Sequence, residues 1–448
     1  MSNFLTNDFE PYSAAAWKQK IQVDLKGVDY NEALLTQTNE GITIKPFYHL
    51  DEFEKLNIPA TNDDFKICDN IYITSEKEAK KRAEEIINKG ANAIKFIVKN
   101  EFNIDELFKN LLEKNIEFHF QFEFISEKFI SALASTLKNE TVFYNVDIIG
   151  NLAKTGNWYS SFNNDFDIVK KLISTNTLLS VNADIYQNAG ANTVQQVAYA
   201  LAHANEYLTK FGGETATNIQ FNFAIGSNYF FEISKIRAFK YLLNLVLQKY
   251  NTSVQAKIYA EPTLRNKTLY DYNVNLLRTT TESMSAILGG ATTIANTPYD
   301  VLFHNSNEFG DRIARNQLLV LREESYFSNA QHIASDSYYI EAITKQIAEK
   351  ALLIFKEIEQ SGGFLHQLKK GTIQRKIREN AQKEQGQFNE GKLVLLGTNK
   401  YPNELDKMKD NLDINPFLKH NPQKTLIIPI LAKRLADKLE LKRLKDEA

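Results

Sequence analysis

Cysteine is almost absent from this sequence, and the short glycine-rich signatures of nucleotide-binding enzymes are missing altogether. The single cysteine among 448 residues, Cys68, cannot form an intrachain disulfide or supply a cysteine-rich zinc site, and it indicates a reducing compartment. The chain contains no GxGxxG fingerprint, no P-loop and no GxSxG nucleophile elbow. These absences argue against a dinucleotide-binding domain, a P-loop enzyme and a hydrolase with a serine elbow.

An excess of charge of one sign is also lacking. Lys and Arg number 53 and Asp and Glu number 55, which gives a formal net charge of -2 and no overall field to attract nucleic acid or an anionic membrane. No apolar window is long enough to span a bilayer. The start of the chain, MSNFLTNDFEPYSAAAW, has acids and aromatics where a secretion signal has a basic and then an apolar stretch. We therefore expect a cytoplasmic protein that binds neither nucleic acid nor membrane.

Histidine is scarce and scattered. The seven histidines are His49, His119, His203, His304, His332, His366 and His420, and none forms an HxH or HExxH pair. A metal site is not predicted, because these spacings do not bring imidazoles together. His119 lies inside a predicted strand. It is more simply interpreted as a hydrogen-bonded core residue than as a metal ligand.

Short β-rich runs alternate with amphipathic helical patterns from about residue 70 to residue 325. The eight candidate strands are 71–73, 93–98, 116–124, 142–148, 178–184, 219–225, 254–260 and 292–295. The candidate helices are 75–90, 105–113, 126–138, 166–173, one after residue 192, 229–249, 275–288 and 311–324. Eight such pairs in about 250 residues have the dimensions of a (β/α)8 TIM barrel. A doubly wound open sheet is the alternative, but its dinucleotide-binding form requires the glycine fingerprint that is missing here.

Three regions follow from this pattern. Residues 1–65 lack periodicity and are expected to form an extended N-terminal arm, residues 66–330 form the barrel, and residues 331–448 form a helical C-terminal extension with a linker. Within the extension the sequence predicts a long helix ending at Gly362 and Gly363 and a second helix over 369–386. A linker is expected over 399–422, and Pro429 suits the first turn of a last helix, in which Leu431, Leu435 and Leu439 form a stripe.

The mouth of a barrel is built from the carboxyl ends of its strands. On this assignment it receives Glu123, Asp147, Asp184, Glu261 and Asn296. Paired carboxylates can act as general acid and base or hold a hard cation, and the simpler interpretation is that they are solvated or cap the following helices. No His, Lys or Cys joins them at these strand ends, so the expected mouth is acidic and poorly equipped.

Two further features have simple structural interpretations. Gly289 and Gly290 follow a predicted helix and suit its C-terminal cap. A basic run comprises Lys369, Lys370, Arg375, Lys376 and Arg378. This run is most simply a solvated helix face, and its functional alternative is a contact for phosphate or for an acidic partner surface.

Six stretches are more specific than any of these patterns. They are EGITIKPFY (40–48), FAIGSNYFFEISKIRAFKYL (223–242), NLLRTTTESMSAILGG (275–290), DRIARNQLLVLREES (311–325), SDSYYIEAIT (335–344) and GTNKY (397–401). In content and order they resemble methylmalonyl-CoA mutase, over most of the chain beyond about residue 140 and more loosely before it. The resemblance implies a (β/α)8 barrel of the kind that holds acyl-CoA, which in the catalytic chains of the family is followed by a flavodoxin-like domain that binds adenosylcobalamin.

The catalytic positions of the family are degenerate here. The Tyr-His pair before the Gln-Glu-Ala-Gly-Ala run falls on Asp184 and Ile185, the His and Gln of Arg-Thr-His-x-Gln fall on Tyr259 and Glu261, and the His of Ser-Leu-His-Thr-Asn falls on Ala295. The Arg-Gln-Tyr-Ala-Gly segment and the cobalamin signature DxHxxG have no counterpart. We therefore expect no catalytic residue, no cofactor-binding or metal-binding residue and no cobalamin-binding domain in this chain. Acyl-CoA is strongly anionic, so Asp184 and Glu261 are expected to disfavour it.

The resemblance with these losses is typical of the small, non-catalytic subunit of a heterodimeric methylmalonyl-CoA mutase. It implies a large catalytic partner subunit that carries adenosylcobalamin, and a structural or stabilising role for this chain, whose first 50 or so residues wrap the partner. Two alternatives stay open. One is an active acyl-CoA mutase barrel that uses a separate cobalamin-binding subunit, and the other is a stand-alone acyl-CoA-binding barrel.

Overall fold

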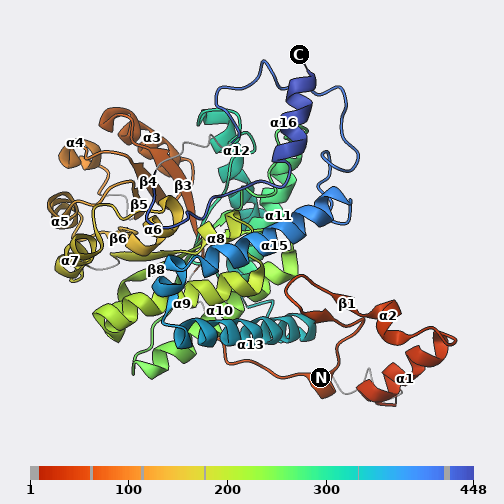
Figure 1. Ribbon diagram of the computed structural model, residues 1–448. Coiled ribbons are helices and arrows are strands. Elements are labelled where there is room, and N and C mark those ends of the chain that lie inside the picture. Colours follow the sequence, from red (N-terminus) through yellow and green to blue (C-terminus); the bar gives the residue numbers. More distant parts are fainter. Residues whose placement is uncertain are drawn as a thin grey trace.

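Eight parallel strands form a barrel at the centre of the protein (Figure 1). The computed structural model describes residues 10–60, 64–112, 116–175, 178–330, 332–417 and 424–447. The strands are β3 (Lys66–Tyr72), β4 (Ala93–Val98), β5 (Glu117–Phe122), β6 (Thr141–Phe143), β7 (Leu179–Asn182), β8 (Ile219–Ile225), β9 (Lys257–Pro262) and β10 (Thr293–Ala295). Their order is β6-β5-β4-β3-β10-β9-β8-β7, and a parallel bridge between Val146 and Leu179 joins the two ends. The predicted (β/α)8 barrel is confirmed.

All eight predicted strands are present, and helices cover them from outside. Every residue of β4 and of β8 is buried, as expected for parallel strands with both faces covered. The first strand is longer than predicted, since β3 begins at Lys66 rather than at residue 71. Its polar residues find partners inside the fold: Asp69 pairs with Arg315, and Asn70 contacts Glu261.

Helices surround the barrel in the predicted places. They are α3 (Glu76–Asn88), α4 (Ile104–Phe108), α5 (Glu127–Thr136), α7 (Phe162–Leu172), α9 (Thr193–Phe211), α10 (Tyr229–Lys249), α11 (Val274–Gly289) and α12 (Glu308–Leu319), which continues as a π-helical turn, Val320–Glu324. Gly290 ends α11 with φ 91°, which confirms its predicted role as a cap. The short helices α6 (Ile148–Thr155) and α8 (Asp184–Asn188) and the 3-10 turns Gly213–Asn218 and Phe327–Asn329 were not predicted. Residue 113, where the second predicted helix ends, lies outside the described residues.

The N-terminal arm has two parts. Helices α1 (Ala14–Asp24) and α2 (Tyr30–Leu34) project from the body of the protein, as Figure 1 shows in red. The hairpin of β1 (Thr36–Gln37) and β2 (Thr43–Ile44), followed by a 3-10 turn (Leu50–Glu52), is instead held to the C-terminal helices. Asn39 and Gln387 exchange two side-chain hydrogen bonds of 2.7 and 2.9 Å, and Ile42 is fully buried. The hairpin is therefore anchored, whereas α1 buries none of its residues.

The C-terminal extension begins with the predicted helices. The long α13 (Tyr338–Gln360) lies beside α9 and α10, and α14 (Phe364–Lys369) and α15 (Thr372–Asn389) follow (Figure 1). The end of the predicted linker, at residue 422, and His420 lie outside the described residues. No helix that the structure describes is long and apolar enough to cross a membrane.

The helix predicted from Pro429 is wrong. Residues 424–436 form an irregular segment, the C-terminal strap, and α16 begins only at Asp437 and runs to Asp446. The backbone N–H groups of Ile430, Lys433 and Leu435 donate to Ala153, Asn188 and Arg265, at 2.7, 2.9 and 2.9 Å. Because other segments accept these hydrogen bonds, the strap cannot use the same donors within a helix.

Candidate functional site at the mouth of the barrel

A cavity of about 920 Å³ opens at the carboxyl ends of the strands. Every strand, or the residue pair just after it, contributes a polar side chain to the lining: Asn70 (β3), Lys95 (β4), Gln121 (β5), Asn145 (after β6), Asn182 (β7), Asn222 (β8), Glu261 (β9) and Asn296 (after β10). This is the end of the fold at which barrel enzymes assemble their chemistry. The cavity is therefore the candidate functional site.

Three of the five predicted mouth residues, Asp184, Glu261 and Asn296, line the cavity. Two of the degenerate family positions, Ile185 and Tyr259, line it as well.

Two of the other residues named from the sequence lie apart from the cavity. Ala295 is fully buried in the interior of the barrel, in a cluster with Cys68, Ala93 and Tyr259. Glu123 is exposed in the loop after β5. Neither residue lines the cavity.

The expectation of an acidic mouth without lysine is wrong. Lys95 projects from the middle of β4, and its Nζ lies 3.8 Å from Glu261 Oε2 and 4.5 Å from the centroid of the Tyr259 ring. Three more cations, Arg82, Lys99 and Lys154, line the cavity. The prediction considered only the last residues of the strands and missed long side chains that reach the mouth from elsewhere. The sequence did contain a signal for this cation, because Lys95 interrupts the apolar run of β4.

Glu261 and Tyr259 belong to a hydrogen-bonded group at one wall. Asn70 Nδ2 donates to Glu261 Oε1 at 3.0 Å, and the Tyr259 hydroxyl donates to Asn70 Oδ1 at 3.2 Å. Burial, followed by the nearby Glu261 carboxylate, raises the pKa of Tyr259 well above its ordinary value. The Tyr259 side chain is therefore a neutral, hydrogen-bonded phenol that does not readily lose its proton.

Asp184 occupies the first turn of α8 and is only partly exposed. Burial raises its pKa, while Lys95 and Lys154 act in the opposite direction. Its Oδ1 has no hydrogen-bond partner among the described residues. Asp184 is therefore the least satisfied carboxylate of the mouth, and Ile185 beside it offers no group for proton transfer.

Asp147 is a structural residue and does not line the cavity. It caps α6, accepting from the N–H of Gly150 at 2.7 Å, and it accepts from the N–H of Asn182 on β7 at 2.8 Å. The Tyr207 hydroxyl donates to it at 2.7 Å, and His203 Nε2 lies 2.9 Å away. The interpretation that a strand-end acid caps the next helix is confirmed for Asp147, which also fastens β6 to β7.

His119 is the core residue that its position predicted. It is fully buried on β5, its Nδ1 lies 3.3 Å from Gln220 Oε1, and its ring stacks on Phe143 with centroids 4.5 Å apart. Within the described ranges, no group of three or more His, Cys, Asp or Glu side chains could hold a metal ion.

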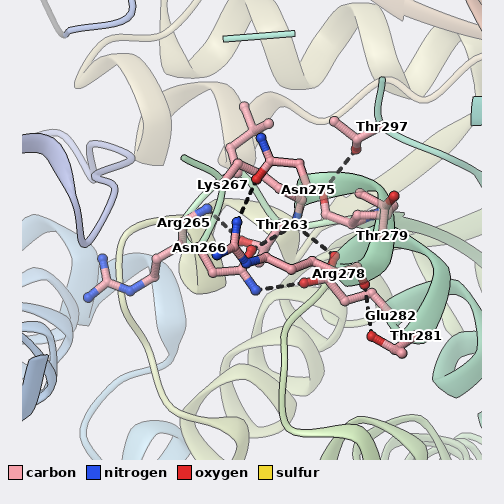
Figure 2. A network of polar contacts seen from close by, with 12 residues as sticks. Thr263, Arg265, Asn266, Lys267, Asn275, Arg278, Thr279, Thr281, Glu282 and Thr297 are labelled. Carbon is pink, nitrogen blue, oxygen red and sulfur yellow. Dashed lines mark hydrogen bonds and ion pairs between the residues drawn. The ribbon is translucent and has the colours of Figure 1, made fainter. Parts of the chain in front are cut away.

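A buried polar network supports the loop between β9 and α11 (Figure 2). Lys267 Nζ donates to Glu282 Oε2 and to Asn266 Oδ1, both at 2.7 Å, and Asn266 Nδ2 donates to Glu282 Oε1 at 2.6 Å. The C-terminal segment completes it, because Glu440 accepts from the N–H of Leu269 at 2.7 Å. Sequence reasoning missed this network, since Lys267 and Glu282 share no periodic pattern.

The comparisons with known proteins agree on one family. The family profile described as methylmalonyl-CoA mutase matches residues 136–446. The methylmalonyl-CoA mutase small subunit of Porphyromonas gingivalis is 31% identical over an alignment that covers 92% of this chain and 73% of that protein. The methylmalonyl-CoA mutase of Escherichia coli is 30% identical over 55% of this chain, and the human mitochondrial enzyme is 28% identical over 58%. Only 36% of the length of each of these two longer proteins is matched.

Proposed function

Because the chain belongs to the methylmalonyl-CoA mutase family, we propose that it is the non-catalytic small subunit of a heterodimeric, cytoplasmic methylmalonyl-CoA mutase. In this complex the large subunit interconverts succinyl-CoA and methylmalonyl-CoA, and this chain has a structural or stabilising role. The observation that carries the proposal is the likeness to a small subunit over 92% of the chain.

The chemistry of the mouth supports a non-catalytic role. Ile185 and Ala295 have no titratable group, and Tyr259 is buried and hydrogen-bonded to Asn70. These positions therefore supply no general acid or base, and the titratable groups that the mouth does hold, Asp184, Glu261 and Lys95, are not the imidazoles that the family uses there. His304 is the only imidazole among the described residues that line the cavity.

Adenosylcobalamin is placed by this proposal on the partner subunit. Its lower ligand in the family is a histidine, so a cobalt site would need a free imidazole. The two ring nitrogens of His304 lie 3.2 Å from Asp300 Oδ2 and 3.3 Å from Asn411 Oδ1, so neither is free. The described lining of the mouth therefore offers no free imidazole for such a site, and no step of the reaction is assigned to this chain.

Co-expression with the large mutase chain of the same organism tests the proposal. We expect the two chains to co-purify in equal amounts, and the pair to be more active or more stable than the large chain alone. This chain alone is expected neither to convert succinyl-CoA nor to bind adenosylcobalamin. Conversion by the isolated chain contradicts the proposal. Conversion after addition of a separate cobalamin-binding subunit favours an active barrel, and a monomer that retains CoA favours a stand-alone acyl-CoA-binding barrel.

Helix α1 is the part of the arm that we propose to contact the large subunit. Trp17 and Val23 are 52% and 68% exposed, and α1 has no buried residue. Replacing both with serine is expected to weaken the complex more than tenfold, because exposed aromatic and aliphatic anchors supply about 2–3 kcal/mol when an interface buries them. Analytical ultracentrifugation of the two full-length chains measures this.

The matched control replaces Gln19 and Gln22 of the same helix, both exposed, with serine. This pair is expected to leave association unchanged. The glutamine pair is not expected to shift the thermal unfolding of the isolated chain, since both side chains are exposed. The Trp17 and Val23 pair is expected to shift it only by the loss of the stacking of Trp17 on Phe47, whose ring centroids lie 5.6 Å apart. A stoichiometric, equally tight complex with Trp17→Ser and Val23→Ser would exclude α1 from the interface.

A further inference from the structure

The Lys95 ammonium is a buried charge that faces the mouth cavity. The residue lies within β4 and is only 9% exposed. Its Nζ makes no hydrogen bond to any described residue, and the carboxylate oxygen that pairs with it, Glu261 Oε2, is 3.8 Å away. The unbonded polar atoms that are sealed from solvent do not include Lys95 Nζ, so the ammonium is open to the cavity. Three donors without an acceptor are costly in a buried group, so Lys95 points to a ligand that brings acceptor oxygens.

Gln121 supplies a second open donor on the neighbouring strand. In the register of β4 and β5, Gln121 pairs with Ile97, two residues after Lys95, so the side chains of Lys95 and Gln121 are on the same face of the sheet. Both residues line the cavity. The Gln121 amide has no hydrogen-bond partner in the described part of the chain, and it is not sealed from solvent. An ammonium and an amide N–H group are therefore available together.

The charges of the mouth that lack a partner leave a small positive excess. Three acids of the lining are already engaged within the protein: Asp69 with Arg315, Asp311 with Arg82, and Asp300 with Asn307 and His304. The other charges are two acids, Asp184 and Glu261, and three lysines, Lys95, Lys99 and Lys154. Neither Lys99 nor Lys154 has a carboxylate within ion-pair distance among the residues that the structure describes. Three cations against two acids attract a single negative charge.

The two remaining acids set the charge of the ligand. Glu261 Oε2 is 3.8 Å from the Lys95 ammonium, and Asp184 is within electrostatic reach of it. A group with two or more negative charges, placed on Lys95, would meet the repulsion of both carboxylates. A monovalent anion meets the least repulsion and still brings acceptor oxygens, so a carboxylate suits this position better than a phosphate.

An apolar wall lies beside these polar groups. Five apolar side chains line the same cavity: Ile97, Ile185, Phe223, Pro262 and Leu264. Small-molecule sites combine such walls with a few charged or polar groups, and the volume of about 920 Å³ is within their usual range. The lining therefore offers a place for a carbon body as well as for a charge.

We propose that the mouth of the barrel binds a small organic monocarboxylate with an apolar body. The carboxylate accepts charge-assisted hydrogen bonds from Lys95 Nζ and a further one from the Gln121 amide, and the carbon body lies against the apolar wall. The proposal does not depend on the heterodimer, since all of these residues belong to this chain.

Thermal unfolding of the full-length chain, titrated with sodium butyrate, hexanoate and benzoate, tests the proposal. Sodium chloride at the same concentrations corrects for the general effect of salt on stability. At least one of the three is expected to raise the midpoint in a saturable way beyond sodium chloride, as a ligand specific for the folded state does. Isothermal titration then gives the dissociation constant. The matching neutral amides, butyramide, hexanamide and benzamide, are expected to bind at least about tenfold more weakly, because they lack the charge.

Two variants test the assigned donors. Lys95→Met removes the charge and keeps an unbranched side chain, and it is expected to weaken binding by about tenfold or more. Gln121→Leu is expected to weaken it about fivefold, as loss of a neutral hydrogen bond does, and it serves alone if Lys95→Met does not fold. The control is Lys249→Met, an exposed lysine at the end of α10 outside the lining, which is expected to bind as the original chain does.

Four results overturn the proposal. The first is the absence of a saturable shift beyond sodium chloride for all three carboxylates, and the second is equal affinity for the neutral amides. The third is binding that neither Lys95→Met nor Gln121→Leu weakens. The fourth is tighter binding of inorganic phosphate or of coenzyme A than of any of the three, which assigns the cavity to a phosphorylated ligand instead.

Discussion

Replacing Asp147 with alanine is expected to lower the free energy of unfolding by about 3–5 kcal/mol. The carboxylate of Asp147 is buried and accepts hydrogen bonds from the N–H groups of Gly150 and Asn182 and from the Tyr207 hydroxyl, at 2.7 to 2.8 Å. Alanine leaves these buried donors without an acceptor and deprives His203 of its partner. The loss falls at the seam of the barrel, where β6 and β7 share one bridge, Val146 to Leu179.

Urea denaturation of the full-length chain at neutral pH measures this cost. The control is Asp167→Ala on α7, where the side chain is exposed, and we expect a change within about 0.5 kcal/mol. Asp147→Asn keeps the shape of the side chain, so it is expected to fall between the alanine variant and the original chain. A cost below about 1 kcal/mol for Asp147→Ala would show that the seam does not depend on this carboxylate.

The same carboxylate should make stability depend on pH in the acid range. Burial by itself raises the pKa of Asp147, but His203 and the N–H groups of Asn182 and Gly150 outweigh it, and the pKa in the folded protein is lowered. A lowered pKa contributes stability that is present above the unfolded value of about 4 and is lost as the pH falls through the folded value. The difference in stability between the original chain and Asp147→Asn should therefore shrink below about pH 4.

The strands were predictable from the sequence because a strand that is buried on both faces has apolar residues at nearly every position. Ala93–Val98 and Ile219–Ile225 are such strands, and both were placed at their observed bounds. Helices α6 and α8 were not predicted because they begin immediately after short strands, so that their first residues, Ile148 and Asp184, were assigned to the strands 142–148 and 178–184. The prediction of a helix in the C-terminal strap was wrong although the sequence pattern there is periodic. Leu431, Leu435 and Leu439 have helical spacing, but contacts with distant segments decide the backbone between Ile430 and Leu435.

The position of the candidate site could be predicted from the sequence, but the charge and the polar groups of its lining could not. Asp184, Tyr259 and Glu261 lie in the mouth because the carboxyl ends of parallel strands meet there, which topology dictates. The charge balance depends on Lys95, which enters from within a strand, and on Lys154, which lies on a helix that was not predicted. The amides at the strand ends carry no spacing of their own in the sequence. Only the closed barrel makes neighbours of residues as far apart as Asn70 and Asn296.

Replacing Glu282 with leucine is expected to cost about 3–5 kcal/mol, because it leaves the Lys267 ammonium buried without its counter-ion. Both side chains are 1% exposed, and their charged atoms lie 2.7 Å apart in the network of Figure 2. Burial lowers the pKa of Lys267, and the Glu282 carboxylate opposes that shift. Without the carboxylate, the lysine is expected to lose its proton on folding. The exposed pair of Lys392 and Glu390 is the control, and Glu390→Gln is expected to leave the unfolding midpoint unchanged.

The double variant Lys267→Met with Glu282→Leu separates the role of charge from the role of packing. If the single variant fails because of a stranded charge, removing both charges should recover a large part of the loss, since an apolar pair of similar volume can replace a buried ion pair. Asn266 retains a cost in either case, because its Nδ2 donates to Glu282 Oε1. Urea denaturation of the three variants gives the coupling energy. A double variant no more stable than Glu282→Leu would mean that shape, and not charge, fixes the loop between β9 and α11 over the mouth.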